Sequence, residues 1–527
     1  GLGTRFHRFV LGNFSWFWWL VGVIPPVANF VNTYIINAAV KRTRNRPHSF
    51  SARNAYTSWA SLTDRTYFGR HLAPEKITAP QNDVADIVEA FRRSEGAGQT
   101  CPKSTLLFPV FAQYLTDGFL RTKAGHPART TSNHEIDLSP LYGRTEDQTN
   151  ALRLKSELPG EKGRLLSQEQ KNEEYPPFLY LEDGKTIDPR FLDASGELIL
   201  DPPLGLSNHV GQGRERMIFA VGGDRANATP MVTALNTLLL REHNRLAGEL
   251  EKQQSEWNDE RVFQTARNIL IVIYIKLVVE EYINHISSIP FRLRANPKVA
   301  WKADWNRPNW MTIEFALLYR WHPLVPSAVS WNGRQIDSKT LVLDNRLAVE
   351  TGLARSFEEI SANNAMQLTL FNTPDFLLET ERNAIQQGRD LQVATYNQYR
   401  DAMGLPVVTD FNQMTADPNK IQALEQLYGD PDLVEYYFGL FAEDTNPNTP
   451  MPTLMGVMVA LDAFSQALTN PLMSEHVYNA ATFTEWGLKE IKRTKRLSHL
   501  VARTTSTDVS KSITMTRSDW KGRMARF

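Results

Sequence analysis

Apolar residues recur every three or four positions over several long stretches of the chain. These stretches are residues 231–253, 259–287, 311–321, 375–387 and 453–469, and residues 82–122 follow a largely similar pattern. A period near 3.6 residues predicts amphipathic helices, whereas regular alternation of apolar and polar residues, which is scarce here, would predict strands. The pattern therefore predicts a mainly α-helical body.

Two shorter apolar runs lie near the N-terminus. Residues 9–24 and 27–40 are rich in aromatic or aliphatic side chains and are joined by Pro25-Pro26. Each run is shorter than the roughly 20 apolar residues that a bilayer-spanning helix needs. Trp and Phe favour the headgroup region, and the flanking basic residues favour anionic lipid. This pattern predicts a monotopic helical segment that binds one leaflet; the alternative is a helix pair buried against the body.

Composition narrows the range of functions. Lys plus Arg equals Asp plus Glu at 58 each, so no global field points to nucleic acid as a partner. The single cysteine, Cys101, allows no intramolecular disulfide and argues for a reducing compartment. Residues 503–527, rich in Ser, Thr and basic residues, are expected to form a flexible tail.

The residues Tyr319 and His322 are the first candidates for chemistry. On a helix, two residues three apart share a face, so a redox-active phenol would lie beside a potential metal ligand. Neutral imidazole is the commonest protein ligand of transition metals. Taken alone, such a pair more often reflects ordinary packing.

Several motifs in order along the chain carry a resemblance. Residues 314–324 (EFALLYRWHPL) resemble the cyclooxygenase signature, and FAQ at 111–113, NHEIDLSPLYG at 133–143 and REHNR at 241–245 are similar to further family motifs. The chain is identified as a member of the peroxidase–cyclooxygenase superfamily. The resemblance implies a mainly α, haem-peroxidase helical fold behind the N-terminal membrane segment. It divides the chain into a membrane-binding segment and channel mouth (1–75), a catalytic domain (76–502) and the tail.

The same resemblance implies a haem b cofactor. His322 would ligate the iron, Trp321 and Arg225 would line the cofactor site, and Tyr437 would support the histidine through a hydrogen-bond chain. Relatives that esterify their haem use a Glu and a Met where this chain has Ala228 and Thr229. Noncovalent binding is therefore expected.

The distal side departs from the family pattern. Gln113 and Asp117 lie four apart on one predicted helix face, and the family places a glutamine and a histidine at that spacing. A distal base moves a proton between the two oxygens of a peroxide, and a carboxylate does this if a dry pocket raises its pKa. Without such a shift, the site would be a poor peroxidase.

Four residues resemble those of the family's substrate channel. Arg70 falls on the arginine that receives a fatty-acid carboxylate, and Ile289 stands where the family has a tyrosine that assists it. Ser465 looks like a channel-lining serine, and Phe315 precedes Tyr319 in the signature segment.

The leading hypothesis is a haem-dependent dioxygenase. A radical on Tyr319 would take a hydrogen atom from an unsaturated fatty acid, and dioxygen, the co-substrate, would add to give a hydroperoxide. One alternative is a haem peroxidase or peroxygenase with Asp117 as its acid–base group; the other is a noncatalytic haem- or lipid-binding relative. A membrane-surface location and a homodimer complete the expectations, while the lipid and the stereochemistry stay open.

Overall fold

The computed structural model of the chain describes residues 15–41, 64–77, 81–94, 96–209, 211–446, 448–505, 507, 509 and 511–522. The basic residues that flank the two N-terminal apolar runs, before Ser15 and after Lys41, lie outside this part, as do residues 9–14 of the first run.

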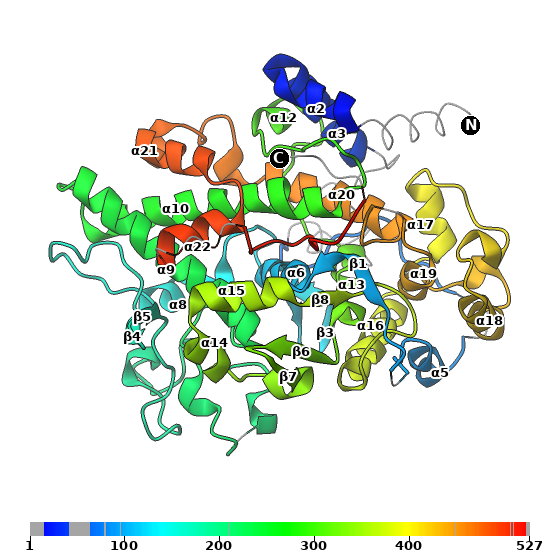
Figure 1. Cartoon of the computed structure of the whole chain (residues 1–527), viewed down its shortest axis with the longest axis horizontal. Helices are drawn as coiled ribbons and strands as arrows, with labels where there is room; N and C mark the ends of the chain where they lie inside the picture. Colours follow the sequence, from blue (N-terminus) through cyan, green and yellow to red (C-terminus); the bar gives the residue numbers. More distant parts are fainter. Residues whose placement is uncertain are drawn as a thin grey trace.

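Two long helices form the centre of the molecule (Figure 1). The helices α9 (Pro230–Gln253) and α10 (Asp259–Leu277) pack on each other, and α10 continues through the π-helical turn η4 (Val278–Ile283) into α11 (Asn284–Ile286). Thr229 and Asn258 cap the two helices by accepting backbone N–H bonds in the first turn. Residues 259–286 are long and apolar enough to cross a membrane, but 78% of their most apolar window is buried in protein. They therefore serve here as a core helix.

Further helices surround this pair and confirm a mainly helical body. Those that carry site residues are α6 (Leu107–Phe119), α13 (Ile313–Leu318), α16 (Leu378–Asp390), α19 (Tyr436–Ala442) and α20 (Thr453–Leu468). The other α-helices of the described chain beyond residue 80 are α5 (Val84–Glu89), α7 (Ser139–Tyr142), α8 (Glu146–Ala151), α12 (Lys298–Trp301), α14 (Arg346–Thr351), α15 (Leu353–Ala362), α17 (Tyr396–Ala402), α18 (Pro418–Leu427), α21 (Ala480–Arg493) and α22 (Leu497–Thr505). The 3₁₀ turns are η1 (Pro189–Phe191), η2 (Leu206–His209), η3 (Glu215–Met217), η5 (His322–Leu324), η6 (Ser338–Leu341), η7 (Asp375–Leu377), η8 (Phe411–Gln413), η9 (Pro431–Leu433) and η10 (Pro471–Met473).

The strands are short and pair two by two in antiparallel fashion. The pairs are β1 (Thr100–Thr105) with β8 (Asn364–Met366), β2 (Thr122–Lys123) with β3 (His126–Thr130), β4 (Gln168–Gln170) with β5 (Glu173–Tyr175), and β6 (Ala328–Trp331) with β7 (Arg334–Asp337). The stretch 82–122 is thus less helical than its periodicity predicts. The strand β1 lies between α5 and α6, and it pairs with β8, which is distant in the sequence.

One predicted helix ends early. The periodicity predicts a helix over 311–321, but α13 stops at Leu318, and Tyr319 is its C-terminal cap with φ −87° and ψ 16°. Pro323 disfavours helical backbone at the preceding residue, and His322 begins the separate turn η5. Tyr319 and His322 therefore do not share one helix face, which corrects the geometry expected from their spacing.

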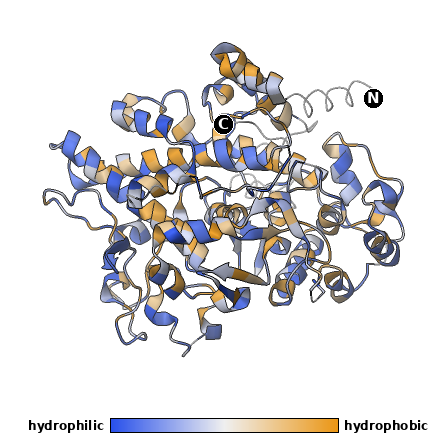
Figure 2. Ribbon diagram, in the orientation of Figure 1, coloured by the Kyte–Doolittle hydropathy of each residue, from blue (hydrophilic) through white to orange (hydrophobic). Residues whose placement is uncertain are grey.

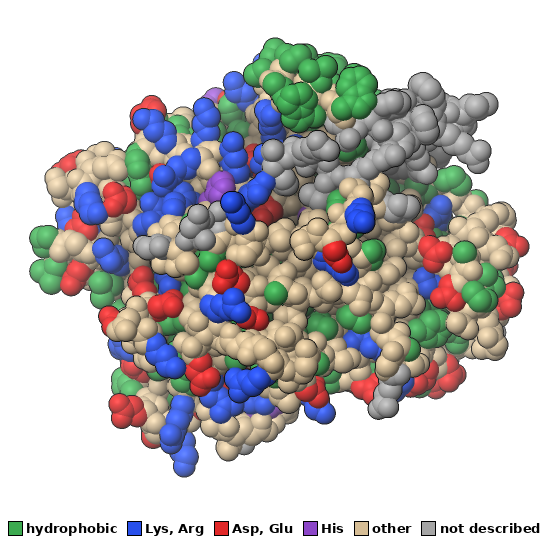
Figure 3. Space-filling model, in the orientation of Figure 1, with side chains coloured by type: hydrophobic (Ala, Val, Ile, Leu, Met, Phe, Trp, Pro, Cys, Tyr) green, Lys and Arg blue, Asp and Glu red, His purple; other side chains and the backbone are tan. Residues whose placement is uncertain are grey.

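The N-terminal helices α2 (Ser15–Val23) and α3 (Pro25–Val40) meet at a bend of 114°. The buried side of α3 packs on α20, and the Asn32 side chain bonds the backbone of Arg294 in both directions, at 3.1 and 2.8 Å. On the surface of the helix pair that faces away from the body, Trp16 and Trp19 of α2 and Phe30 of α3 are between 56% and 72% exposed. Figures 2 and 3 show these helices as a hydrophobic projection at one end of the molecule.

Part of the expected tail is built into the body. The backbone N–H of Thr105 in β1 donates to Met515, at 2.9 Å, and that of Arg517 donates to Lys103, at 2.8 Å. Ile513 and Met515 are buried. In Figure 1 the described C-terminal residues run across the molecule beside β1. Residues 511–522 thus differ from the expectation of a flexible segment because alternate apolar side chains enter the core.

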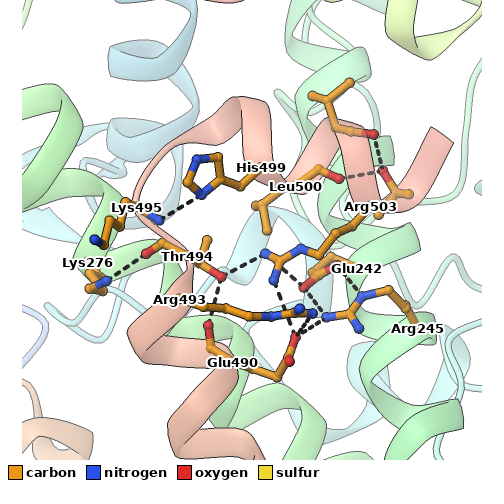
Figure 4. Close-up of polar contacts among 12 residues, drawn as sticks. Glu242, Arg245, Lys276, Glu490, Arg493, Thr494, Lys495, His499, Leu500 and Arg503 are labelled. Carbon is orange, nitrogen blue, oxygen red and sulfur yellow. Dashed lines mark hydrogen bonds and ion pairs between the residues drawn. The ribbon is translucent and has the colours of Figure 1, made fainter. Parts of the chain in front are cut away.

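The REHNR motif on α9 joins helices that are distant in sequence (Figure 4). Arg245 pairs with Glu242 on its own helix and with Glu490 on α21, at 2.8 and 2.6 Å. Arg503 on α22 lies 3.6 Å from Glu242 and 3.3 Å from Glu490. His243 bonds Tyr142 at 2.7 Å and the Gly163 carbonyl at 2.9 Å. The motif therefore acts as a structural junction.

Candidate functional site

The phenol of Tyr319 lies inside an aromatic cluster. Its ring stacks on Trp321 with centroids 4.3 Å apart and contacts Phe315 at 4.6 Å. Its hydroxyl oxygen accepts a hydrogen bond from Tyr282 at 3.2 Å. Burial raises the pKa of Tyr319 well above its usual range, so the phenol is neutral across ordinary pH. A neutral phenol in dry surroundings is a hydrogen-atom donor and not a phenolate nucleophile.

Helix α6 supplies the opposite wall of this cluster. Phe108 stacks on Trp321 at 5.7 Å and on Tyr282 at 5.5 Å, and Phe111 contacts Tyr282 at 5.3 Å. Sequence reasoning missed Tyr282, which η4 presents to Tyr319. A tyrosine in a long apolar helix looks like ordinary core, so no local signal singles it out.

A buried carboxylate faces His322. The Nδ1 atom of His322 lies 3.2 Å from Oε1 of Glu381 in α16, and the Glu381 side chain is fully buried. Tyr437 donates its hydroxyl hydrogen to Oε2 of Glu381 at 2.5 Å. Glu381 thus connects the predicted supporting tyrosine to the predicted ligand. Its place on the buried face of α16, beside Leu378 and Ala384, was the available sequence signal.

The residues Gln113 and Asp117 project from α6, as their spacing predicts. Asp117 is 6% exposed, and burial raises its pKa to about 6. Nη1 of Arg225 lies 3.7 Å from Oδ1 of Asp117, while Oδ2 has no hydrogen-bond partner among the described residues. This carboxyl group can therefore exchange a proton near neutral pH.

The segments that carry Asp117 and His322 meet through Gln387 of α16. Gln387 accepts a bond from Arg320 at 3.0 Å and donates to Thr122, just after α6, at 3.4 Å. Burial lowers the pKa of Arg320, and Arg225 on the Asp117 side adds to this effect. The segment that carries Asp117 and the segment that carries His322 therefore lie close to each other around Gln387.

These groups fit a haem. Within the described chain, neither ring nitrogen of His322 makes a hydrogen bond, although Nδ1 lies 3.2 Å from Glu381, and Oδ2 of Asp117 is likewise a buried polar atom without a partner. One imidazole is the protein ligand that haem iron requires in many proteins. His322 would hold the iron, and Asp117, Gln113 and Arg225 would face a ligand of that iron.

The predicted substrate residues behave differently from one another. Arg70 is fully buried, and its three side-chain nitrogens donate to the carbonyls of Leu72, Leu391 and Gln392 at 3.1, 2.6 and 3.2 Å. These bonds give Arg70 a structural role and use three of its five N–H groups, while its contact with a fatty-acid carboxylate stays a prediction. Sequence similarity aligned the residue but could not show that each of its three side-chain nitrogens already donates to a backbone carbonyl.

The other three lie in apolar surroundings. Phe315 touches the ring of Tyr319, and the buried hydroxyl of Ser465 donates to the Asp462 carbonyl on its own helix at 2.9 Å. Ile289 is half-buried in the loop that also carries Phe291, whose ring contacts Trp18 of α2. Phe315 thus lies next to the phenol, and Ile289 lies near the N-terminal helices.

Comparisons with known proteins agree with this arrangement. The family model for animal haem peroxidases matches residues 89–514. Prostaglandin G/H synthase 2 of Equus caballus is 29% identical over 491 residues, covering 90% of this chain and 76% of that protein. The fatty acid alpha-dioxygenase of Arabidopsis thaliana has a TM-score of 0.70 at 15% identity, covering 98% of this chain and 93% of that one. Peroxidase A of Dictyostelium discoideum has a TM-score of 0.64 at 17% identity, covering 87% and 95%. At these identities the structural likeness establishes a shared fold.

Proposed function

Because the chain belongs to the animal haem peroxidase family, we propose that it is a haem-dependent dioxygenase that uses a radical on Tyr319 to oxygenate an unsaturated fatty acid. The observation that carries this proposal is the buried, neutral phenol of Tyr319, stacked on Trp321 and three residues from His322. A fatty acid is proposed because a prostaglandin synthase and a fatty acid alpha-dioxygenase are among the similar proteins.

The residues of this chain divide the work. His322 would hold a noncovalent haem b, which, once oxidised by a hydroperoxide, would supply the one-electron oxidant for the phenol. Tyr319 loses an electron and its hydroxyl proton, and its oxygen then takes a hydrogen atom from the acyl chain. Dioxygen adds to the carbon radical, and the peroxyl oxygen takes a hydrogen atom back from Tyr319. The net reaction joins one fatty acid and one dioxygen into one hydroperoxide, and the tyrosyl radical is regenerated.

The surroundings of Tyr319 suit this chemistry. Phe315 and Trp321 exclude water from the phenol, and the hydrogen bond from Tyr282 fixes the direction of its oxygen. Since each side-chain nitrogen of Arg70 donates to a backbone carbonyl, the proposal does not depend on a contact between Arg70 and the fatty-acid carboxylate.

Oxygen uptake tests the proposal. Haem-reconstituted protein is mixed with an unsaturated eighteen-carbon fatty acid, and dissolved oxygen is followed beside Tyr319→Phe. We expect uptake in the wild type, and its loss in the variant with the haem spectrum retained. Tyr175→Phe, at a buried tyrosine of a separate cluster, is the matched control and should keep the activity. Equal uptake in wild type and Tyr319→Phe would exclude the tyrosyl mechanism.

A peroxidase is the second candidate, and the environment of Asp117 favours it. A buried carboxyl with a pKa of about 6 and an unpartnered Oδ2 is suited to take a proton from one peroxide oxygen and return it to the other. Peroxide consumption without oxygen uptake would select this function. Haem binding with turnover of neither oxidant would instead indicate a noncatalytic relative.

We also propose that α2 and α3 bind one leaflet of a membrane. Their exposed face carries Trp16, Trp19 and Phe30, and the 114° bend favours lying along a surface. A fatty acid could then enter from the lipid phase.

A further inference from the structure

A buried carboxylate, that of Glu381, lies beside the histidine proposed as haem ligand and has no part in the proposed reaction. Glu381 places Oε1 3.2 Å from Nδ1 of His322, which is within ion-pair distance. Nδ1 has no hydrogen-bond partner in the described chain, so a hydrogen bond to this carboxylate needs only a small turn of the ring. Within the described chain, His322 is the one basic side chain at ion-pair distance from this carboxylate. An acid buried so completely needs partners, and its place beside a ligating imidazole gives it influence over that ligand.

Two neutral donors fix the orientation of Glu381. Thr373 donates its hydroxyl hydrogen to Oε1 at 2.8 Å, and Tyr437 donates to Oε2 at 2.5 Å. The Tyr437 ring is itself held by stacking on Phe91 at 5.7 Å. In the described chain, no Lys or Arg lies at ion-pair distance from this carboxylate, although Arg320 interacts with it electrostatically from further away. His322 is therefore the nearest basic group that the carboxylate can act on.

We propose that Glu381 is a positioning residue that accepts a hydrogen bond from Nδ1–H of His322, fixes Nε2 as the ligating atom and makes the imidazole a stronger electron donor to haem iron. The inference rests on the proposed function because it takes His322 as the ligand. A carboxylate that accepts the second ring proton raises the basicity of the ligating nitrogen. A more basic ligand stabilises ferric iron relative to ferrous iron and lowers the reduction potential.

This arrangement has a consequence for the distal side. Proton transfer by a distal base and electron donation from the proximal ligand are two separate aids to peroxide O–O cleavage. Asp117 replaces the imidazole base with a carboxylate, which is a weaker base even with a pKa of about 6. Glu381 strengthens the proximal contribution, and so compensates for the change at residue 117.

The test measures the reduction potential of the haem iron and its bond to the imidazole, and it does not depend on catalytic turnover. The ferric/ferrous midpoint potential of the reconstituted full chain is measured by spectroelectrochemistry for wild type and Glu381→Gln, together with the iron–imidazole stretch by resonance Raman. We expect the ferric-over-ferrous preference to fall about tenfold in the variant, a rise of about 59 mV for one electron, with a lower stretching frequency. Glu490→Gln, a buried glutamate in the junction of Figure 4, should leave both readings unchanged.

The variant Tyr437→Phe provides an independent test of the proposal if Glu381→Gln does not fold. Tyr437→Phe preserves the carboxylate but removes the donor on Oε2, which concentrates charge on Oε1 and should lower the potential. Unchanged values in either folded variant, or a rise in Tyr437→Phe, would overturn the proposal.

Different results would contradict the dioxygenase function and the positioning role of Glu381. A protein without oxygen uptake whose potential still shifts in Glu381→Gln retains this inference and loses the dioxygenase function. An unaltered iron–imidazole band in His322→Ala would remove the shared premise that His322 is the ligand.

Discussion

At the scale of single residues, Asp117 has the largest chemical consequence, because it stands where the family pattern has a histidine. Its neighbours Asp224 and Arg225 act on its pKa in opposite directions, and burial is the dominant influence. The resulting value of about 6 places the change of protonation inside the working range of an enzyme.

The pH dependence of peroxide turnover follows from this value. The reaction needs the ionised carboxylate, so we expect the rate to rise with pH through about 6 and then level off. Asp117→Asn should lower the rate by about 10²–10⁴-fold and remove that limb. Stopped-flow measurement with an alkyl hydroperoxide checks this. Asp117→His provides the family's own base and should retain activity; an unchanged pH profile in Asp117→Asn would exclude Asp117 as the base.

The same carboxyl affects stability with a definite sign. Its folded pKa of about 6 exceeds its ordinary value of 3.8, so the folded state binds the proton more tightly and loses stability as pH rises from about 4 to 6. In haem-free protein, Asp117→Asn should therefore be more stable than wild type at pH 7, by at most about 3 kcal/mol. This advantage should vanish below pH 4. Thermal unfolding midpoints across pH measure it, and a constant difference would contradict the raised pKa.

At the scale of elements, α21 and α22 are held to α9 by ion pairs around buried acids. Oε2 of Glu490 lies 2.6 Å from Arg245, 2.7 Å from Arg493 and 3.3 Å from Arg503, and Figure 4 shows these groups converging. Lys276 of α10 also donates to the carbonyls of Lys492 and Thr494 at the end of α21. The C-terminal helices thus depend on polar contacts as well as on apolar packing.

Removal of the Glu490 charge should loosen this junction. Glu490→Gln keeps the volume but leaves Arg245 and Arg503 short of a counter-charge. Breaking one partner of a buried pair costs about 3 kcal/mol or more. We expect a lower thermal unfolding midpoint, measured by circular dichroism. Glu485→Gln, at an exposed position of α21, should show no change; equal stability of both variants would mean that the ion pairs add nothing net.

At the scale of the whole molecule, the helices α2 and α3 carry a hydrophobic face that no described residue of the body covers. The helices α2 and α3 project from the body in Figure 3, and Lys and Arg side chains lie beside them in the same view. Large exposed apolar patches on soluble proteins mark interaction sites, and adjacent basic groups suit anionic headgroups.

Binding to vesicles tests this face. We expect the double variant Trp19→Ser/Phe30→Ser to lose about 3 kcal/mol of binding to vesicles that contain anionic lipid, a decrease of more than a hundredfold. Cosedimentation measures the bound fraction. Leu158→Ser, at an exposed leucine far along the chain from this segment, is the control. Unchanged binding of the double variant would show that another surface meets the membrane.

Much of this architecture follows from the sequence. Local periodicity located α9, α10, α16 and α20 because helix formation depends on neighbours three and four residues apart. Family motifs singled out Tyr319, His322 and Asp117 as candidates because the chemistry of a site restricts residue type at fixed spacing. The mainly helical fold and the haem-peroxidase family were both predictable at this level.

Only the tertiary structure decided which side chains meet across distant segments. It placed Glu381 beside His322, gave Tyr319 a hydrogen bond from Tyr282, and used every nitrogen of Arg70 for backbone carbonyls. It also ended α13 before Tyr319 and drew residues 511–522 into the core. Such contacts depend on how whole helices pack, and the one-dimensional pattern of the chain does not encode which face of one helix meets which face of another.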